Sequence, residues 1–147
     1  MKKILMFSAF VLAAAGTFAN APSEVSEKVL KAFRETFTEA RQISWQESND
    51  NYTVRFMQKE VRYIVYYSRD GVITNSMRFY RPDLLPVNIL KEIKNNYKSR
   101  TIYGVTEITS DGEIAYFVKM EDSKYWYTVR FSAYGNSEPY EKFRKQQ

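Results

Sequence analysis

The chain has 147 residues, with 22 lysine and arginine side chains against 17 acidic ones, and it contains neither histidine nor cysteine. These two absences exclude a histidine general base, a thiolate nucleophile, zinc centres with histidine or cysteine ligands, and disulfide bonds. The length suits one domain with a single hydrophobic core, and the mild positive charge is not a nucleic-acid signature. We therefore expect no cofactor, no nucleic-acid partner and no Ser-His-Asp chemistry.

The first 21 residues have the pattern of a bacterial export signal. Lys2-Lys3 is a basic start, residues 4–15 are apolar, and Ala19-Asn20-Ala21 offers a cleavage site. Because the apolar run is too short for a spanning helix, we expect a signal peptide over 1–21 and no stable membrane insertion after its cleavage. The remaining domain, 22–147, is then periplasmic or secreted. Cleavage after Ala19 and an uncleaved amino-terminal anchor are the alternatives.

The first helix is expected to run from Ser23 or Ser26 to Ala40. Both serines are suitable helix N-caps, and the apolar residues that follow recur every four positions, which places them on one face of a helix. These residues are Val29, Phe33 and Phe37. Alternating apolar and polar residues then predict four strands at about 42–47, 51–58, 60–67 and 72–80.

A second helix is expected to start at Pro86, because proline is tolerated at the first helical position. It repeats the apolar stripe of the first helix with Ile89, Ile93 and Tyr97, at an offset of 60 residues. Three further strands are predicted at about 101–109, 113–120 and 124–132, followed by a polar tail.

The two segments are therefore copies of one supersecondary unit. Repeat one covers about 23–80 and repeat two about 84–137, with the tail reaching 147. Units of this size cover their apolar faces with each other. Short turns such as Asp70-Gly71 force neighbouring strands to be antiparallel. The sequence thus predicts an α+β fold, in which two tandem α-β-β-β(-β) repeats form one antiparallel sheet with two helices packed on one face.

The alternation assigns the strand residues to two faces of this sheet. The face that carries most apolar and aromatic residues should contact the helices, with tyrosine hydroxyls reaching the rim. The other face, which no further helix is expected to cover, mixes aromatic and basic residues, and interfaces favour these types. The candidate partner-binding residues on this open face are Arg55, Met57, Arg62, Ile64, Tyr66, Phe117, Lys119, Trp126 and Arg130. The alternative is a solvated face on which arginine and lysine stems cover the rings.

Carboxylates are the remaining candidates for chemistry. Glu47 and Asp50 flank one predicted hairpin, and Glu107, Asp111 and Glu113 flank its counterpart in repeat two. Paired carboxylates can hydrolyse glycosides or bind calcium. Hairpin tips are also acidic simply because they are solvated and because aspartate turns well. We favour this second interpretation, since the spacing fits no calcium loop, and we predict no catalytic and no metal site.

The pattern resembles a known group of exported proteins. The residues that carry the resemblance are the helix stripe Val29, Phe33 and Phe37, then Ala40, Ile43 and Trp45, the strand end Val65-x-Tyr67-x-x-Asp70-Gly71, Leu85-Pro86 with a second helix ending at Tyr97, and the degenerate second copy. They are similar to the PepSY-like, β-lactamase-inhibitor-like exported family of Bacteroidetes-type bacteria. The resemblance covers essentially the whole mature chain. It implies tandem repeats, an eight-stranded type of antiparallel sheet with one open face, an exported location and no enzyme activity.

In the inhibitor proteins of that architecture, the open face and a protruding hairpin grip the target. The nearest match to that hairpin here is the tip from Glu47 to Asn51. We therefore predict a non-catalytic exported module, inhibitor-like or otherwise binding, that uses its open face for an unknown envelope protein or peptide. The alternatives are a self-associating structural envelope protein and a small carboxylate-dependent hydrolase.

Overall fold

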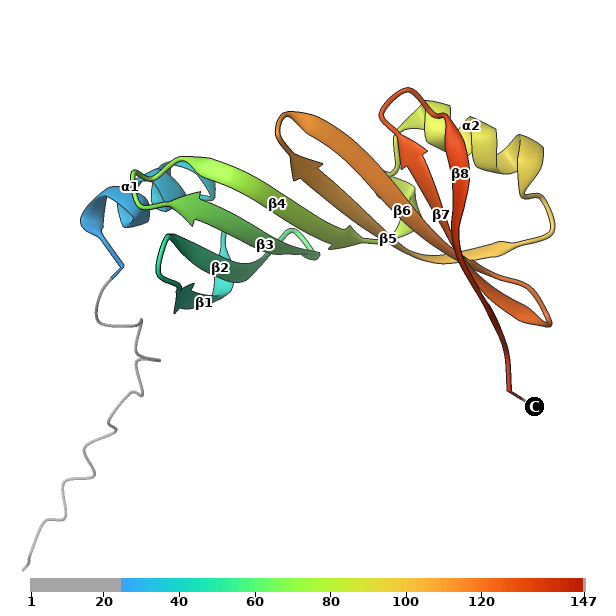
Figure 1. Ribbon diagram of the computed structural model, residues 1–147, viewed down its shortest axis with the longest axis horizontal. Coiled ribbons are helices and arrows are strands. Elements are labelled where there is room, and N and C mark those ends of the chain that lie inside the picture. Colours follow the sequence, from blue (N-terminus) through green and yellow to red (C-terminus); the bar gives the residue numbers. More distant parts are fainter. Residues whose placement is uncertain (1–24, 147) are drawn as a thin grey trace, which may run out of the picture.

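The computed structural model describes residues 25–146, so the predicted signal peptide lies outside the described residues. Within this range, one antiparallel sheet contains eight strands side by side in chain order, and two α-helices lie against it (Figure 1). None of the helices described is long and apolar enough to cross a membrane. The helices are α1 (Glu27–Thr36) and α2 (Val87–Asn96), and the strands are β1 (Arg41–Glu47), β2 (Asn51–Gln58), β3 (Val61–Ser68), β4 (Ile73–Tyr80), β5 (Thr101–Ser110), β6 (Glu113–Glu121), β7 (Tyr125–Ser132) and β8 (Ser137–Arg144).

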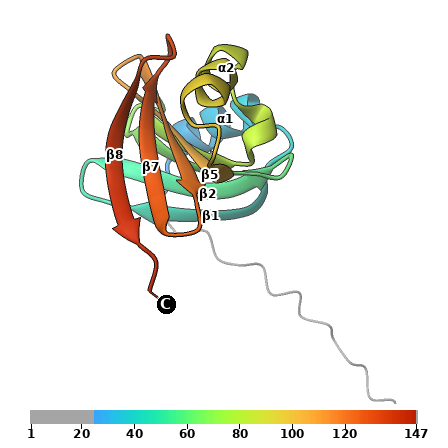
Figure 2. The same cartoon turned by 90° about the vertical axis from the view of Figure 1, so that its right-hand side faces the viewer.

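The predicted fold class is confirmed, because both helices pack on the same face of the sheet. The α1 stripe is buried on β2 and β3, and the α2 stripe on β5, β6 and β7. Tyr63 packs against both of these groups and joins them into one layer. Figure 2 shows the two helices on one side of the twisted sheet. The residues that are buried to 2% exposure or less include Val29, Val54, Phe56, Val65, Tyr67, Ile89, Val118, Met120, Val129 and Phe131.

The first helix is shorter than the sequence predicts. Ser26 is its N-cap, and its hydroxyl accepts a hydrogen bond from the Val29 amide at 3.4 Å. The helix ends at Thr36 rather than Ala40, because the backbone of Phe37 leaves the helical region at φ −121° and ψ 72°. The Phe37 ring still contacts Phe56, with 4.6 Å between ring centroids. The apolar stripe therefore continues beyond the helix that it predicted.

Each repeat places the same type of glycine turn, between two strands, against its helix. In the β3–β4 turn, the Gly71 amide donates to the Ser68 carbonyl at 3.0 Å, and the Gly135 amide does the same to Ser132 in the β7–β8 turn. Both glycines have positive φ, +81° and +91°. A Cβ on Gly71 would lie 3.3 Å from the carbonyl oxygen of Lys28 in α1. Glycine is therefore required at position 71 for two reasons, the positive φ of the backbone and the close approach of α1.

The carboxyl-terminal segment is a strand, and the prediction of a polar tail from about 137 was wrong. Strand β8 pairs with β7 from Phe131↔Ser137 to Tyr125↔Arg144, with one bulge near Pro139. An edge strand contributes backbone hydrogen bonds on one side only, and charged residues and proline are common there because they prevent further pairing. The polarity that suggested a tail is therefore what an edge strand needs.

One tyrosine hydroxyl does not reach the rim as expected. Tyr67 is fully buried beneath α1, and its hydroxyl has no hydrogen-bond partner within the described part of the chain. Burial raises the pKa of Tyr67 to about 12, because the phenolate cannot be solvated there. The Tyr67 ring fills space in the core. Burial of its hydroxyl without a hydrogen bond costs free energy, which the packing of the ring offsets.

The β6–β7 hairpin depends on one ionised carboxylate. Asp122 accepts hydrogen bonds from the Tyr127 hydroxyl at 2.6 Å and from the amides of Lys124 and Tyr125, both at 2.8 Å. The Tyr127 bond, followed by the Lys124 amide, lowers the pKa of Asp122 to about 2, against an ordinary value of 3.8. The same bond raises the pKa of Tyr127. The ionised form of Asp122 therefore adds to the stability of the hairpin beyond its strand pairing.

We predict a loss of stability in acid that Asp122→Asn removes. Because the folded pKa lies below the unfolded one, the contribution of Asp122 is complete above pH 3.8 and is lost as the pH falls towards 2. The free energy of unfolding of wild type and Asp122→Asn, measured by denaturant titration, should therefore differ near neutral pH and converge in strong acid. A difference that stays constant over this pH range would contradict the assignment.

Candidate interaction surface

The open face is the sheet surface opposite the two helices. Strand register places all nine predicted residues on it. One cross-strand row runs Met57↔Arg62↔Phe79, and continues through Thr106 to Phe117↔Arg130. The row beside it contains Arg55↔Ile64↔Met77, and Tyr66, Lys119 and Trp126 occupy further positions of the same parity.

The two halves of this face differ in exposure. On β2 and β3, the charged ends of Arg55 and Arg62 are exposed, whereas the apolar residues between them are half-buried. The Arg62 guanidinium lies 4.6 Å from the centre of the Phe79 ring, and Arg55 donates to Gln46 at 3.1 Å. This half therefore follows the alternative interpretation, in which arginine stems cover the rings.

Exposed aromatic side chains gather on the other half, over β5 to β8. Trp126 is 38% exposed, and its ring meets Tyr103 edge-on at a centroid distance of 5.1 Å. Phe143 is its cross-strand neighbour, and Phe117 contacts Tyr140 at 4.9 Å. We call these five residues the aromatic cluster. They form neighbouring groups on one side of the sheet, an arrangement more typical of an interaction site than of scattered surface residues.

Three members of the cluster were missed from the sequence. Tyr103 sits at the β5 bulge between Ile102 and Gly104, so simple alternation assigns it to the wrong face. Tyr140 and Phe143 belong to β8, which the sequence analysis treated as a tail. The spacing of aromatic and charged residues in that segment was the available signal for a strand, but its high charge outweighed it.

Charged groups around the cluster are mostly neutralised within the protein. Lys145 forms a 2.7 Å ion pair with Glu121, and its ammonium also lies 4.3 Å from the Trp126 ring centre. Arg130 is paired with Glu138, also at 2.7 Å. The rings are therefore the dominant feature of this half of the open face, and its charge is mixed rather than strongly basic.

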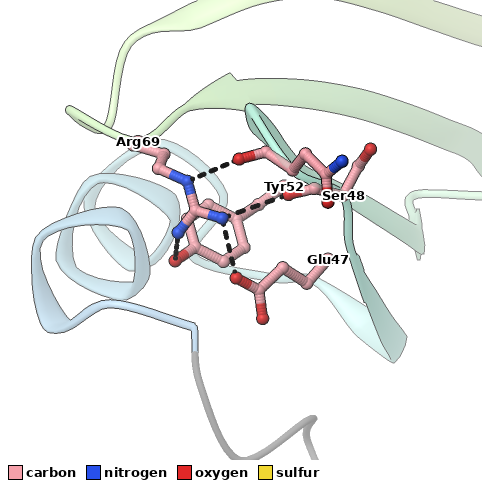
Figure 3. A network of polar contacts seen from close by, with 5 residues as sticks. Glu47, Ser48, Tyr52 and Arg69 are labelled. Atoms are coloured by element: carbon pink, nitrogen blue, oxygen red, sulfur yellow. Dashed lines mark hydrogen bonds and ion pairs between the residues drawn. The ribbon is translucent and has the colours of Figure 1, made fainter.

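The β1–β2 hairpin tip is held in place by an arginine from the β3–β4 turn. Arg69 donates to the carbonyls of Asn49 and Ser48 at 3.1 and 3.2 Å and forms a 2.9 Å ion pair with Glu47 (Figure 3). It also donates to the Tyr52 hydroxyl at 3.2 Å. All three nitrogen atoms of the Arg69 guanidinium thus donate hydrogen bonds to the hairpin. Position 133, which matches Arg69 in the second repeat, is alanine, so this clamp belongs to the first repeat alone.

One of the carboxylates that were expected at hairpin tips lies elsewhere. Asp50, Asp111 and Glu113 are exposed at hairpin tips, as expected, but Glu107 is buried, with 5% exposure. It lies on the helix-facing side, where it accepts hydrogen bonds from Arg78 Nε at 2.9 Å and from the Tyr80 hydroxyl at 2.7 Å. Burial and then Glu107 raise the pKa of Tyr80. The sequence could not show this, because Arg78 comes from a different strand.

These contacts are those of structural carboxylates. Glu47 and Glu107 each accept a charge-assisted bond from an arginine, so neither carries an uncompensated charge at its hairpin. Within residues 25–146, no group of three or more potential ligand side chains is arranged to hold a metal ion. The geometry around both residues favours fixing of the fold over acid–base chemistry.

An eight-stranded antiparallel sheet with one open face and two helices on the other defines the class of fold, and solved structures of BLIP-like proteins share it. A BLIP-like protein from Bacteroides fragilis NCTC 9343 superposes with a TM-score of 0.60 at 15% identity, covering 81% of this chain and 85% of that chain. A DUF2874 family protein from Bacteroides uniformis ATCC 8492 also gives 0.60, at 14% identity, covering 81% and 88%. A candidate periplasmic protein from Bacteroides eggerthii DSM 20697 gives 0.60 at 14% identity, covering 81% and 88%.

At these identities the likeness establishes the fold and not an activity. No family model matches the chain, and no curated protein matches it. The chain therefore shares its fold with a BLIP-like protein, whereas the PepSY-like part of the resemblance stays a prediction.

Proposed function

We propose that this protein is a non-catalytic module of the bacterial cell envelope that binds a protein or peptide partner with its open sheet face. The observation that carries the proposal is the aromatic cluster on β5 to β8. Tyrosine and tryptophan supply large contact areas and dominate the energetics of many interfaces. The cluster contains one tryptophan, two tyrosines and two phenylalanines, and four of its five rings are exposed. It is therefore the best-suited surface for a partner that the described residues offer.

Envelope location rests on two observations. The amino-terminal sequence has the pattern of an export signal, and one structural neighbour is a candidate periplasmic protein. An exported domain without cysteine must rely on its core alone for stability. The two packed helices and the eight-stranded sheet supply such a core.

An inhibitor-like mode is a more specific form of the same proposal. One of the structural neighbours is a BLIP-like protein. The Arg69 clamp holds the β1–β2 tip in one conformation, which reduces the entropy lost when a loop docks into a partner. In this mode the tip and the open face would contact one target together, as in the inhibitors that the sequence resembles.

We predict that Trp126→Ala weakens partner binding without unfolding the domain. Its ring is more than one third exposed, so the free energy of unfolding should change by no more than about 1 kcal/mol, as for other surface substitutions. Arg55→Ala should behave likewise on the other half of the face, with a smaller effect on binding. A partner identified by affinity capture from the envelope is purified, and its dissociation constant is measured for each variant.

Tyr134→Ala is the matched control. Tyr134 is the most exposed aromatic residue described, at 89%, and lies in the β7–β8 turn outside the cluster. If Tyr134→Ala and Trp126→Ala weaken binding equally, the cluster is not the interface. If Trp126→Ala leaves binding unchanged, the proposal for this face is wrong and the Arg69-clamped tip becomes the candidate.

The same preparation separates the alternative functions. Sedimentation at several concentrations detects self-association, for which the edge strands β1 and β8 are the available pairing sites. Glycosidase, peptidase and esterase substrates test for hydrolysis. Turnover that is abolished by Glu47→Gln or Glu107→Gln, in a variant that remains folded, would favour a carboxylate-dependent hydrolase over a binding module.

A further inference from the structure

A hollow lies at the β8 edge of the sheet, beside the carboxyl-terminal end of α2. It has a volume of about 390 Å³ and is bordered by the turn after α2 and by β7 and β8. Tyr97, Tyr127, Val129 and Pro139 supply apolar walls, and Arg100 and Lys142 supply two positive charges. This volume lies within the range of small-molecule pockets, which combine apolar walls with a few polar groups.

The arginine of this hollow is held by aromatic rings. The Arg100 guanidinium carbon lies 3.8 Å from the centre of the Tyr127 ring and 5.1 Å from that of Tyr97. Stacking fixes the plane of a guanidinium while it leaves the N–H groups along its edge available for a planar oxyanion. Within residues 25–146, the Arg100 side chain forms no hydrogen bond and no ion pair.

Lys142 places a second cation beside the same ring. Its ammonium lies 5.6 Å from the Tyr127 ring centre and 4.0 Å from that of Tyr125, and it too forms no ion pair within the described part of the chain. Two basic groups without a carboxylate partner therefore flank one tyrosine.

The neighbouring carboxylates are already engaged. Asp122 attracts Arg100 at longer range, but its oxygens accept from the Tyr127 hydroxyl and from two backbone amides. Glu141, which also borders the hollow, accepts from the Thr128 hydroxyl at 3.3 Å. Asp122 thus fixes the Tyr127 ring on which Arg100 stacks, and neither acid occupies the edge of the guanidinium.

We propose that this hollow binds a ligand that carries a carboxylate next to an apolar group. Arg100 binds the carboxylate through its N–H edge, Lys142 adds a second charge, and the apolar group packs on Tyr97, Val129 and Pro139. The carboxylate can belong to a small aromatic acid or to the carboxyl terminus of a peptide, since both present the same chemistry. Tyr140 borders the hollow and also belongs to the aromatic cluster. None of the residues that contact the ligand in this proposal is part of that cluster, and the site does not depend on the proposed function.

The test is an NMR chemical-shift titration with paired acids and amides. Phenylacetate is compared with phenylacetamide, and acetyl-Ala-Phe with its carboxyl-terminal amide. The acids should shift resonances around Arg100 and Tyr127, and the amides should bind roughly ten- to hundredfold more weakly, the loss expected when a hydrogen bond to a charged group is removed. Binding by one acid and not the other identifies the source of the carboxylate.

Variants decide whether these residues form the site. Arg100→Gln should weaken acid binding by about tenfold or more, and Lys142→Gln by a smaller factor. Lys91→Gln, an equivalent loss of charge on the exposed surface of α2, should leave it unchanged. The proposal is overturned if no acid binds, if acid and amide bind alike, or if folded Arg100→Gln binds like wild type. Should Arg100→Gln unfold, undiminished binding by Lys142→Gln overturns it instead.

Discussion

Phe33→Ala should lower the free energy of unfolding by about 3–5 kcal/mol, as expected for removal of a buried aromatic ring. Phe33 is 3% exposed, and its ring meets those of Trp45, Phe56 and Phe37 at centroid distances of 5.3, 5.1 and 5.6 Å. Together with Val29, it is one of the two fully packed residues through which α1 contacts the sheet. The surrounding rings belong to the edge strand β1, to β2 and to the C-cap of α1, and they cannot all move to fill the cavity.

The effect is measured by denaturant titration of the mature domain. Lys31→Ala, an exposed position of the same helix, is the control and should change stability little. Because the domain has no disulfide, Phe33→Ala could abolish folding, and Phe33→Leu then gives a smaller, measurable loss. A wild-type unfolding midpoint for Phe33→Ala would mean that α1 does not pack through this stripe.

Arg78→Met is expected to cost about 3 kcal/mol, the lower part of the range for breaking a buried ion pair. The Glu107 side chain is 6% exposed, so its charge would remain buried with only the Tyr80 hydroxyl as donor. The Arg78 side chain keeps 41% exposure, which is why we do not expect the upper part of the range. The pair lies between the two helix-covered cores and joins β4 to β5, the strands at which the two repeats meet.

Arg81→Met provides the matched control for this experiment. Arg81 forms a 3.5 Å ion pair with Asp83, but its side chain is 81% exposed, and such pairs contribute about 1 kcal/mol or less. The double variant Arg78→Met/Glu107→Leu should recover part of the lost stability, because it removes the uncompensated charge. If Arg78→Met costs no more than Arg81→Met, the buried pair is not structural, and Glu107 returns as a candidate for chemistry.

The open face shows how far the sequence could predict the candidate site. Alternation in β2, β3, β6 and β7 placed Trp126 and eight other residues on the correct face, because side-chain direction in a regular strand is a local property. Tyr103 was missed since a bulge shifts the alternation at one residue, and a bulge is decided by how two strands pair. Tyr140 and Phe143 on β8 were missed for a related reason, because an edge strand and a polar tail have similar compositions.

Local sequence patterns therefore predicted the types of most elements, the apolar stripes of both helices and the internal repeat. The composition alone excluded chemistry that needs histidine or cysteine. Tertiary structure alone decided which side chains from distant strands meet. Arg78 and Glu107 are 29 residues apart in the chain, Arg69 and Glu47 are 22 apart, and the Arg100 guanidinium stacks on a ring of β7. Periodicity records the direction of each side chain relative to its own backbone. Periodicity does not show which residue lies opposite on the next strand, because that depends on register, bulges and twist.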